Sequence, residues 1–158
     1  RCLSKTIFSS SSLLKILNDE ICETTTRGMF VTMIVGVYDK NKNELLLSNA
    51  GHEPPLIFSK DGNFKTIDEA GPPLGIAPNF KFTEQIISFK ESSMYIFTDG
   101  ITEMKNNNGE MLGQEGFQDY IKKYQSTPNN KRLQKMIEDL ISSGRIQKDD
   151  LTIVTVDG

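Results

Sequence analysis

Three aspartates stand at the ends of two apolar runs, where a rigid backbone would hold their carboxylates in place. Residues 94–97 form an apolar run that leads, through one threonine, into Asp99, and Asp149 and Asp150 directly precede the β-branched run 151–156. Both runs have the composition of buried strands. Carboxylate oxygens fixed in space are the ligands that hard divalent cations prefer, so these acids are candidate metal ligands. An isolated Asp-Gly dipeptide is more typical of a hairpin turn than of a metal site, so the other motifs must decide between the two for Asp99.

Other polar residues are less specific. His52 follows Asn-Ala-Gly in the segment 49–52, and a histidine there is compatible with acid–base catalysis or with a purely structural role. Glu103 either supports a metal ligand or is a solvated loop acid. The stiff Gly-Pro-Pro-Leu-Gly loop, residues 71–75, is interpreted as structural.

Length and composition limit the classes of function. The chain has 158 residues, enough for one domain with one core, and a net charge of −3 from 18 basic and 21 acidic residues. The basic residues form no run, so nucleic acid is not an expected partner. No apolar segment approaches the roughly 18 residues of a membrane span, and no membrane contact is expected. Cys2 and Cys22 have no metal or redox spacing, which favours reduced thiols and a cytoplasmic location.

The hydrophobic pattern predicts strands joined by short polar turns, followed by two helices and a returning strand. Because crossover helices do not separate the strands, the pattern indicates an α+β fold with antiparallel sheet, without a linker or a second domain. The second late helix is expected to have Thr127 as its cap, Pro128 at its first position and Gly144 at its end. We expect a first helix over 13–21, ending near 24–26, strands over 29–38, 45–47, 56–58, 64–67, 83–89, 94–98 and 151–156, and a short helix over 117–124.

Four motifs in a fixed order carry a family resemblance. They are Asn-Ala-Gly-His-Glu-Pro-Pro (49–55), Gly-Pro-Pro-Leu-Gly (71–75), Thr-Asp-Gly-Ile-Thr-Glu (98–103) and Asp-Asp-Leu-Thr (149–152). In this order and at these spacings, the sequence resembles the SpoIIE-like branch of the metal-dependent PPM serine/threonine phosphatases. The resemblance implies a four-layer α-β-β-α sandwich, with two antiparallel sheets face to face and helices outside.

The resemblance also implies roles for individual residues. Asp99 and Asp149 match the family's metal-binding aspartates. Gly100 and Asp150 stand beside them and are expected to support the site without binding the ions. His52 matches the family's Ala-Gly-His motif and is the catalytic candidate. The implied reaction is hydrolysis of phosphoserine or phosphothreonine by a water bridging two Mn²⁺ or Mg²⁺ ions.

The sequence departs from the family pattern at its beginning. Active members carry an upstream Gly-Asp motif on an early strand, and residues 1–158 contain no match to it. We therefore interpret the chain as the C-terminal portion of the phosphatase domain, without its N-terminal strands and inactive by itself. The resemblance implies a phosphoprotein substrate, such as an anti-sigma-antagonist-type regulator, and an upstream sensor or receiver domain. The alternative is a pseudophosphatase that binds a signalling partner without catalysis.

Overall fold

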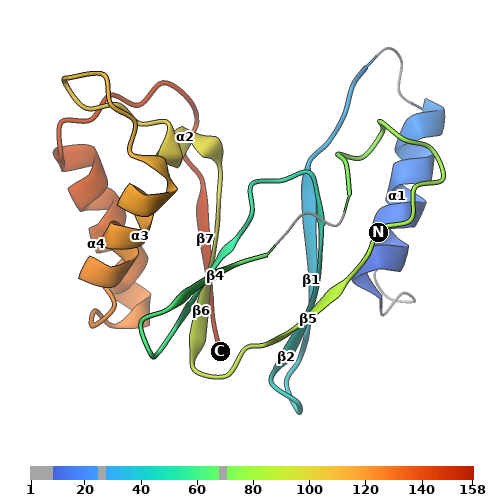
Figure 1. Ribbon diagram of the computed structural model, residues 1–158, viewed down its shortest axis with the longest axis horizontal. Coiled ribbons are helices and arrows are strands. Elements are labelled where there is room, and N and C mark those ends of the chain that lie inside the picture. Colours follow the sequence, from blue (N-terminus) through green and yellow to red (C-terminus); the bar gives the residue numbers. More distant parts are fainter. Residues whose placement is uncertain (1–8, 25–27, 68–70) are drawn as a thin grey trace. The chain divides into compact units, whose positions relative to one another are not determined.

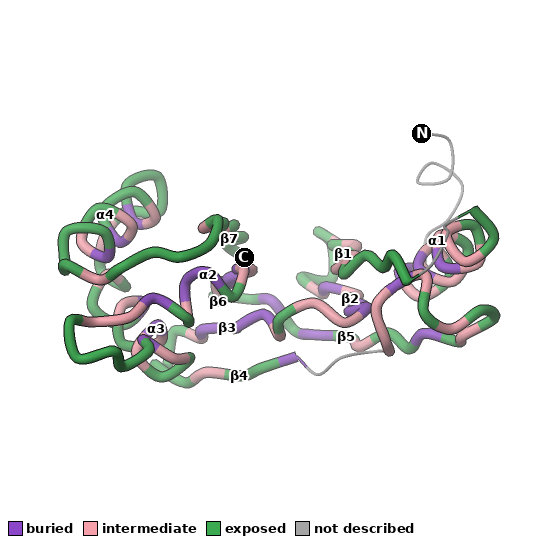
Figure 2. The backbone as a smooth tube through the Cα atoms, turned by 90° about the horizontal axis from the view of Figure 1, so that it is seen from above, coloured by how far each residue is buried: buried purple, intermediate pink, exposed green. Residues whose placement is uncertain are grey.

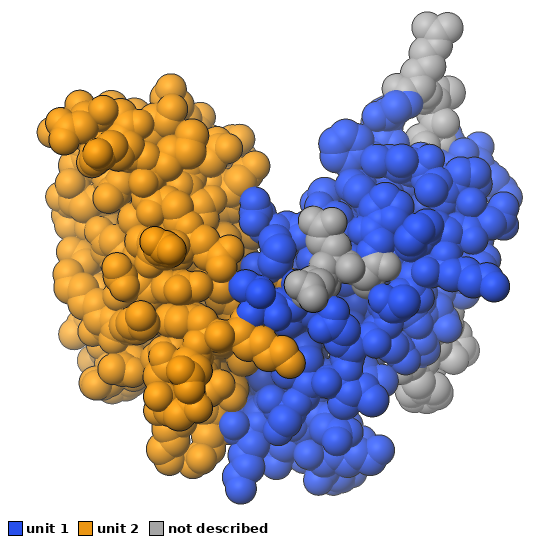
Figure 3. Space-filling model, viewed as in Figure 1, with its two compact units in different colours: residues 1–54, 66–90, 158 blue, residues 55–65, 91–157 orange. Residues whose placement is uncertain are grey.

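The computed structural model describes residues 9–24, 28–67 and 71–158. The chain divides into two compact units, which are described separately and are coloured separately in Figure 3. Unit 1 consists of residues 1–54, 66–90 and 158, and unit 2 consists of residues 55–65 and 91–157. The predicted thiol at Cys2 lies outside the described residues, whereas Cys22 is a free thiol.

Unit 1 is a three-stranded antiparallel sheet that carries one helix (Figure 1). Its elements are α1 (Ser10–Thr24), β1 (Met33–Asp39), β2 (Glu44–Ala50) and β5 (Gln85–Ser88). The sheet has the order β1-β2-β5, with Gly36 opposite Leu47 and Leu45 opposite Ile87. The apolar face of α1 packs on β1 and β2, and the buried residues Leu14, Ala50, Leu74 and Phe82 form the core there.

The beginning of α1 is held by a carboxylate from another part of unit 1. Oε2 of Glu84 accepts hydrogen bonds from the hydroxyls of Ser9 at 3.0 Å and Ser10 at 3.1 Å, and from the backbone N–H of Ser11 at 3.4 Å. The Ser9 hydroxyl also accepts a bond from the N–H of Ser12 at 3.3 Å. The serine run therefore caps the helix together with the Glu84 carboxylate, an anion that the local sequence does not indicate.

Unit 2 is a four-stranded sheet with its helices packed on one face. Its strands are β3 (Leu56–Ser59), β4 (Phe64–Thr66), β6 (Ser92–Phe97) and β7 (Ile153–Asp157), in the order β4-β3-β6-β7. Both β3 and β7 pair antiparallel with β6. The helices are α2 (Asp99–Thr102), α3 (Gly113–Lys123) and α4 (Asn129–Ser142).

Aromatic side chains fill the space between this sheet and its helices. Phe117 of α3 lies with its ring centroid 4.8 Å from that of Phe97 and 6.4 Å from that of Tyr95. Met136 and Leu140 of α4 are buried in the same cluster. Figure 2 shows the buried positions of the strands as purple stretches. This packing fixes β6, the strand that ends just before Asp99.

The α+β class with two antiparallel sheets and flanking helices is confirmed, but several predicted boundaries are wrong. The first strand begins at Met33 instead of residue 29, and the last begins at Ile153 instead of residue 151. Pro128 occupies the N-cap position of α4, where Thr127 was expected. The reason is that Pro128 has ψ of 138°, outside the helical range, so Asn129 is the first helical residue. Within the described residues, no helix has the length and apolar character needed to cross a membrane.

Candidate functional site

The aspartate at the end of β6 begins a short helix and is not part of a hairpin turn. Asp99 is the first residue of α2, and its carbonyl accepts a hydrogen bond from the N–H of Glu103 at 2.8 Å. Its side chain is exposed, and no described residue forms a hydrogen bond or an ion pair with its carboxylate. The turn interpretation of this Asp-Gly dipeptide is therefore wrong, and the carboxylate faces solvent at the end of a buried strand.

The strand pairing brings the second acidic motif to the same place. β7 runs antiparallel to β6, with Ile153 opposite Phe97. Beyond this pair, the N–H of Thr98 donates to the carbonyl of Thr152 at 3.2 Å. The Thr98 hydroxyl accepts from the N–H of Thr152 at 3.1 Å and donates to the carbonyl of Asp150 at 3.2 Å. Thr98 thus joins the two motifs through its hydroxyl and its backbone. Sequence reasoning missed this role, although Thr98 directly precedes Asp99.

Gly100 lies against the backbone of the second motif. A Cβ atom at this position would stand 2.4 Å from the carbonyl oxygen of Asp150 and 3.4 Å from that of Asp149. Any side chain there would push the two motifs apart, so only glycine fits at this position without moving the backbone. The predicted role of Gly100 as a support for a metal site stays a prediction.

The two neighbouring aspartates have different contacts. Oδ1 of Asp149 accepts a hydrogen bond from the N–H of Asp150 at 2.7 Å, and the Asp149 carbonyl accepts one from Nε2 of Gln147 at 2.8 Å. Both side chains are exposed. Asp150 contacts Thr98 through its backbone carbonyl, whereas the carboxylate of Asp149 is oriented by a hydrogen bond. In the part of the chain that is described, no three His, Cys, Asp or Glu side chains gather into a group that could hold a metal ion.

The predicted catalytic histidine lies in unit 1, whereas the aspartates lie in unit 2. The buried side chain of Asn49 fixes its loop, accepting from the N–H of His52 at 2.9 Å and donating to the His52 carbonyl at 2.8 Å. Nδ1 of His52 lies 3.1 Å from the carbonyl oxygen of Glu53. Gly51 has φ of +66°, and a Cβ there would lie 2.4 Å from Cδ of Pro73. The histidine motif and the proline loop are therefore packed against each other.

The loop at residues 71–75 has contacts that agree with a structural role. Gly71 pairs with Ala50, and the N–H of Gly75 donates to Oδ1 of the buried Asn18 at 3.0 Å. These contacts fasten the loop to α1 and β2. Glu103 is exposed, and its N–H caps α2 by bonding to the Asp99 carbonyl.

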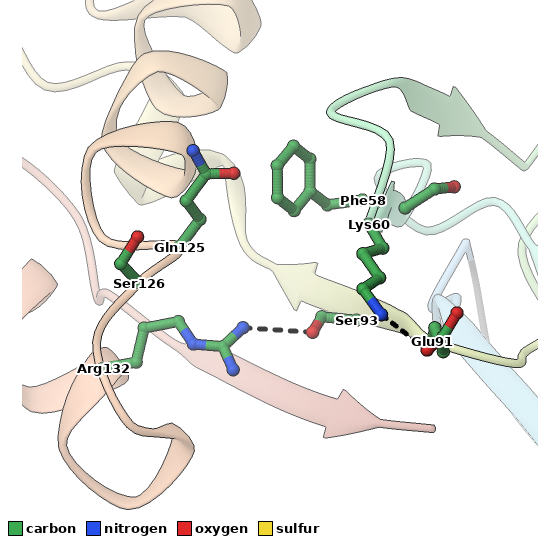
Figure 4. A pocket seen from close by; sticks show the side chains of 8 residues that line it. Phe58, Lys60, Glu91, Ser93, Gln125, Ser126 and Arg132 are labelled. Carbon is green, nitrogen blue, oxygen red and sulfur yellow. Dashed lines mark hydrogen bonds and ion pairs between the residues drawn. The ribbon is translucent and has the colours of Figure 1, made fainter.

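A second polar feature of unit 2 lies near the start of β6, away from Asp99. A pocket of about 270 Å³ is lined by Phe58, Ser59, Lys60, Glu91, Ser93, Gln125, Ser126 and Arg132. Figure 4 shows Arg132 reaching toward Ser93, and Lys60 toward Glu91. Nη1 of Arg132 donates to the hydroxyls of Ser93 and Tyr95 at 3.0 Å each, and Nη2 lies 3.2 Å from Oδ1 of Asp157. These contacts tie α4 to β6 and β7, so the pocket wall is part of the scaffold.

Known proteins resemble this chain in sequence and in fold. The sequence matches the family described as stage II sporulation protein E (SpoIIE) over residues 1–157. The chain belongs to the SpoIIE family. Protein IcfG of Synechocystis sp. is 30% identical over 156 residues, covering 96% of this chain and 24% of IcfG. Phosphoserine phosphatase RsbU of Bacillus subtilis is 27% identical over 157 residues, covering 98% of this chain and 47% of RsbU. The chain therefore spans less than half the length of these two relatives.

Solved structures show the same fold. The SiaA-PP2C domain of Pseudomonas aeruginosa matches with a TM-score of 0.83 and 13% identity, covering 99% of this chain and 64% of that structure. The Mn-presoaked phosphatase domain of SpoIIE from Bacillus subtilis matches with a TM-score of 0.65 and 19% identity, covering 98% of this chain and 67% of that structure. The SpoIIE-family chain thus has the fold of phosphatase domains.

Proposed function

We propose that this SpoIIE-family chain is part of a metal-dependent protein serine/threonine phosphatase, with Asp99 and Asp149 as metal ligands. The observation that carries the proposal is that the β6-β7 pairing, with Thr98 as a joint, sets the two aspartates at one end of the ladder. Membership of the SpoIIE family and the fold of phosphatase domains support the same reaction class.

The donors at this end of the sheet suit Mg²⁺ or Mn²⁺. Both ions prefer carboxylate and carbonyl oxygens, and the two side chains are exposed and available. Asp149 is oriented by the Asp150 N–H, while the absence of a side chain at Gly100 lets the motifs approach. Divalent ions held there would activate a water molecule for attack on phosphorus and offset the charge of the phosphoryl oxygens.

The remaining parts of the site follow from the family resemblance. We propose that the described residues supply only part of the ligand set of a two-ion centre, so that residues 1–158 alone bind Mn²⁺ weakly and do not turn over substrate. His52 is proposed as an acid–base group, held in place through Asn49. Asp150 is proposed to act through its backbone.

The proposed substrate is a phosphoserine or phosphothreonine on a regulatory protein in the cytoplasm, such as an anti-sigma antagonist. The name of RsbU, a phosphoserine phosphatase, supports this substrate class. The sequence also has no nucleotide-binding loop and no cluster of basic residues for a free phosphate compound.

The test is a hydrolysis assay of the natural gene product on phosphoserine peptides and phosphometabolites, with Mn²⁺ and with a chelator. We expect Mn²⁺-dependent turnover that is faster on the peptides. Faster turnover of a metabolite would contradict the substrate class. Binding of a phosphoprotein without any turnover would instead support the pseudophosphatase alternative.

A further inference from the structure

A small β-ladder in unit 2 connects the two acidic motifs on their outer side. Lys105 pairs antiparallel with Met111 and also with Ile146. The N–H of Ile146 donates to the Lys105 carbonyl at 2.8 Å, and the N–H of Lys105 donates to the Ile146 carbonyl at 3.3 Å. Residues directly opposite each other in a ladder point to the same face, so these three side chains lie side by side. We call Lys105, Met111 and Ile146 the outer ladder.

The outer ladder faces solvent because its neighbours face the core. Met104 and Leu112, one position away on each strand, are 1% and 7% exposed and belong to the core of unit 2. Side chains alternate between the two faces of a strand, so Lys105 and Met111 must point outward. Met111 is 54% exposed and Ile146 is 55% exposed. Two large apolar side chains therefore flank one lysine on an open surface.

The turn that closes this hairpin is tightly organised. Oδ1 of Asn106 accepts hydrogen bonds from the N–H groups of Asn108 and Glu110, both at 2.9 Å. Nδ2 of Asn106 donates to Oε2 of Glu110 at 2.8 Å. A hollow of about 300 Å³, lined by residues 106–108, Ser143 and Gly144, opens beside the turn. A surface ordered in this way loses little conformational entropy when it binds a partner.

Short stretches of backbone connect the outer ladder to both aspartates. Between Asp99 and Lys105 the chain forms only the single-turn helix α2 and two further residues, Glu103 and the buried Met104. On the other side, Ile146 lies three positions before Asp149. A peptide chain spans at most about 3.5 Å per residue, so the ladder lies within reach of a few residues of substrate on either side of a bound phosphoserine. Arg145 directly precedes Ile146, and its Nη1 donates to the carbonyls of Met104 at 3.4 Å and Glu110 at 3.5 Å, so its positive charge is held against the hairpin. Together with Lys105 and Lys148, it puts positive charge beside the ladder, which suits a phosphorylated chain.

We infer that the outer ladder is a docking surface for the substrate segment next to the phosphorylated residue. Apolar substrate side chains contact Met111 and Ile146, and the cations beside them attract the phosphorylated chain. The inference rests on the proposed phosphatase function and adds to it a preference for apolar residues near the phosphoserine.

The test uses the natural gene product and fluorescent phosphoserine peptides of about 12 residues that carry either leucine or asparagine beside the phosphoserine. Affinity is measured by fluorescence polarisation in a chelating buffer, and kcat/KM is measured with Mn²⁺ on the same peptides and on p-nitrophenyl phosphate. The variants are Met111→Ser and Ile146→Ser. The matched control is Ile141→Ser, because this α4 side chain is 57% exposed but lies outside the ladder.

We expect each ladder variant to weaken the binding of leucine peptides by about tenfold, the effect of losing one apolar contact. Binding of asparagine peptides and turnover of p-nitrophenyl phosphate should be unchanged. Equal binding by wild type and both variants, or equal loss in the Ile141→Ser control, would overturn the docking surface. Absence of all Mn²⁺-dependent turnover would contradict the proposed function separately, since the polarisation measurement still reports docking.

Discussion

The two aspartates before β7 make their contacts with different atoms, so mutations can separate their roles. Asp149 presents a carboxylate oriented by the Asp150 N–H, whereas Asp150 contacts Thr98 through its backbone carbonyl. In the natural gene product, Asp149→Asn should abolish Mn²⁺-dependent hydrolysis of a phosphoserine peptide because a neutral amide is a poor ligand. Asp150→Asn should keep substantial activity. Equal losses in the two variants would contradict the assignment.

Gly100 provides a second test at the level of one residue. In Gly100→Ala, the Cβ would meet the Asp150 carbonyl oxygen at 2.4 Å, so the two motifs must separate. We expect a loss of about 1–3 kcal/mol in the free energy of unfolding, together with loss of Mn²⁺-dependent activity. Urea denaturation and the peptide assay measure the two effects.

Gly62→Ala, in the turn between β3 and β4, is the matched control for this variant. Gly62 has φ of +87°, and no atom lies within 4 Å of the position that a Cβ would take, so alanine there meets strain but no clash. The substitution should lower the free energy of unfolding by about 1–2 kcal/mol and leave activity intact. Full activity in Gly100→Ala would show that the close approach of the motifs is not needed.

At the level of elements, one arginine fastens α4 to the sheet. Arg132 is 8% exposed and contacts Ser93, Tyr95 and Asp157. Arg132→Met should lower the free energy of unfolding by about 1–3 kcal/mol, because the tyrosine hydroxyl and the half-buried carboxylate lose their donor. Lys131→Met, an exposed neighbour on α4, should change stability by less than about 0.5 kcal/mol. Similar urea midpoints for the two variants would argue against this role.

The same arginine affects the ionisation of Tyr95. Burial raises the pKa of Tyr95 above its ordinary value of 10.0, and the hydrogen bond and charge of Arg132 partly offset this increase. The strand and helix therefore share one polar contact inside an otherwise apolar core.

The attachment of α1 should depend on pH through Glu84. Partial burial opposes ionisation of this carboxyl, but hydrogen bonds from the Ser11 N–H and the hydroxyls of residues 9–11 outweigh it and hold the pKa of Glu84 below its ordinary value of 4.5. Its contribution to stability is therefore present above pH 4.5 and is lost as the pH falls through the lower folded-state pKa. The free energy of unfolding, measured at a series of pH values through 4.5 and below, should depend less steeply on pH in Glu84→Gln than in the wild type. An unchanged slope would contradict the prediction.

For the molecule as a whole, the sequence predicts what is local and misses what depends on distant contacts. Alternating apolar residues and turn residues predicted the antiparallel strands, and the positions of Asp99 and Asp149 at strand ends agree with the structure, whereas their role as metal ligands stays a prediction. The predicted cap at Thr127 was wrong because Pro128 has an extended ψ of 138° and α4 begins one residue later, at Asn129. The outer ladder pairs Lys105 with Ile146, 41 positions later, and neither segment has a strand pattern of its own.

The most direct measurement of the central claim is isothermal titration of the natural gene product with Mn²⁺. The wild type is compared with a double variant, Asp99→Asn with Asp149→Asn, and thermal unfolding without metal confirms that both proteins are folded. We predict that the wild type binds two Mn²⁺ ions and that the double variant loses this binding while remaining folded. Binding of two Mn²⁺ ions by the double variant with undiminished affinity would contradict the assignment of Asp99 and Asp149 as metal ligands.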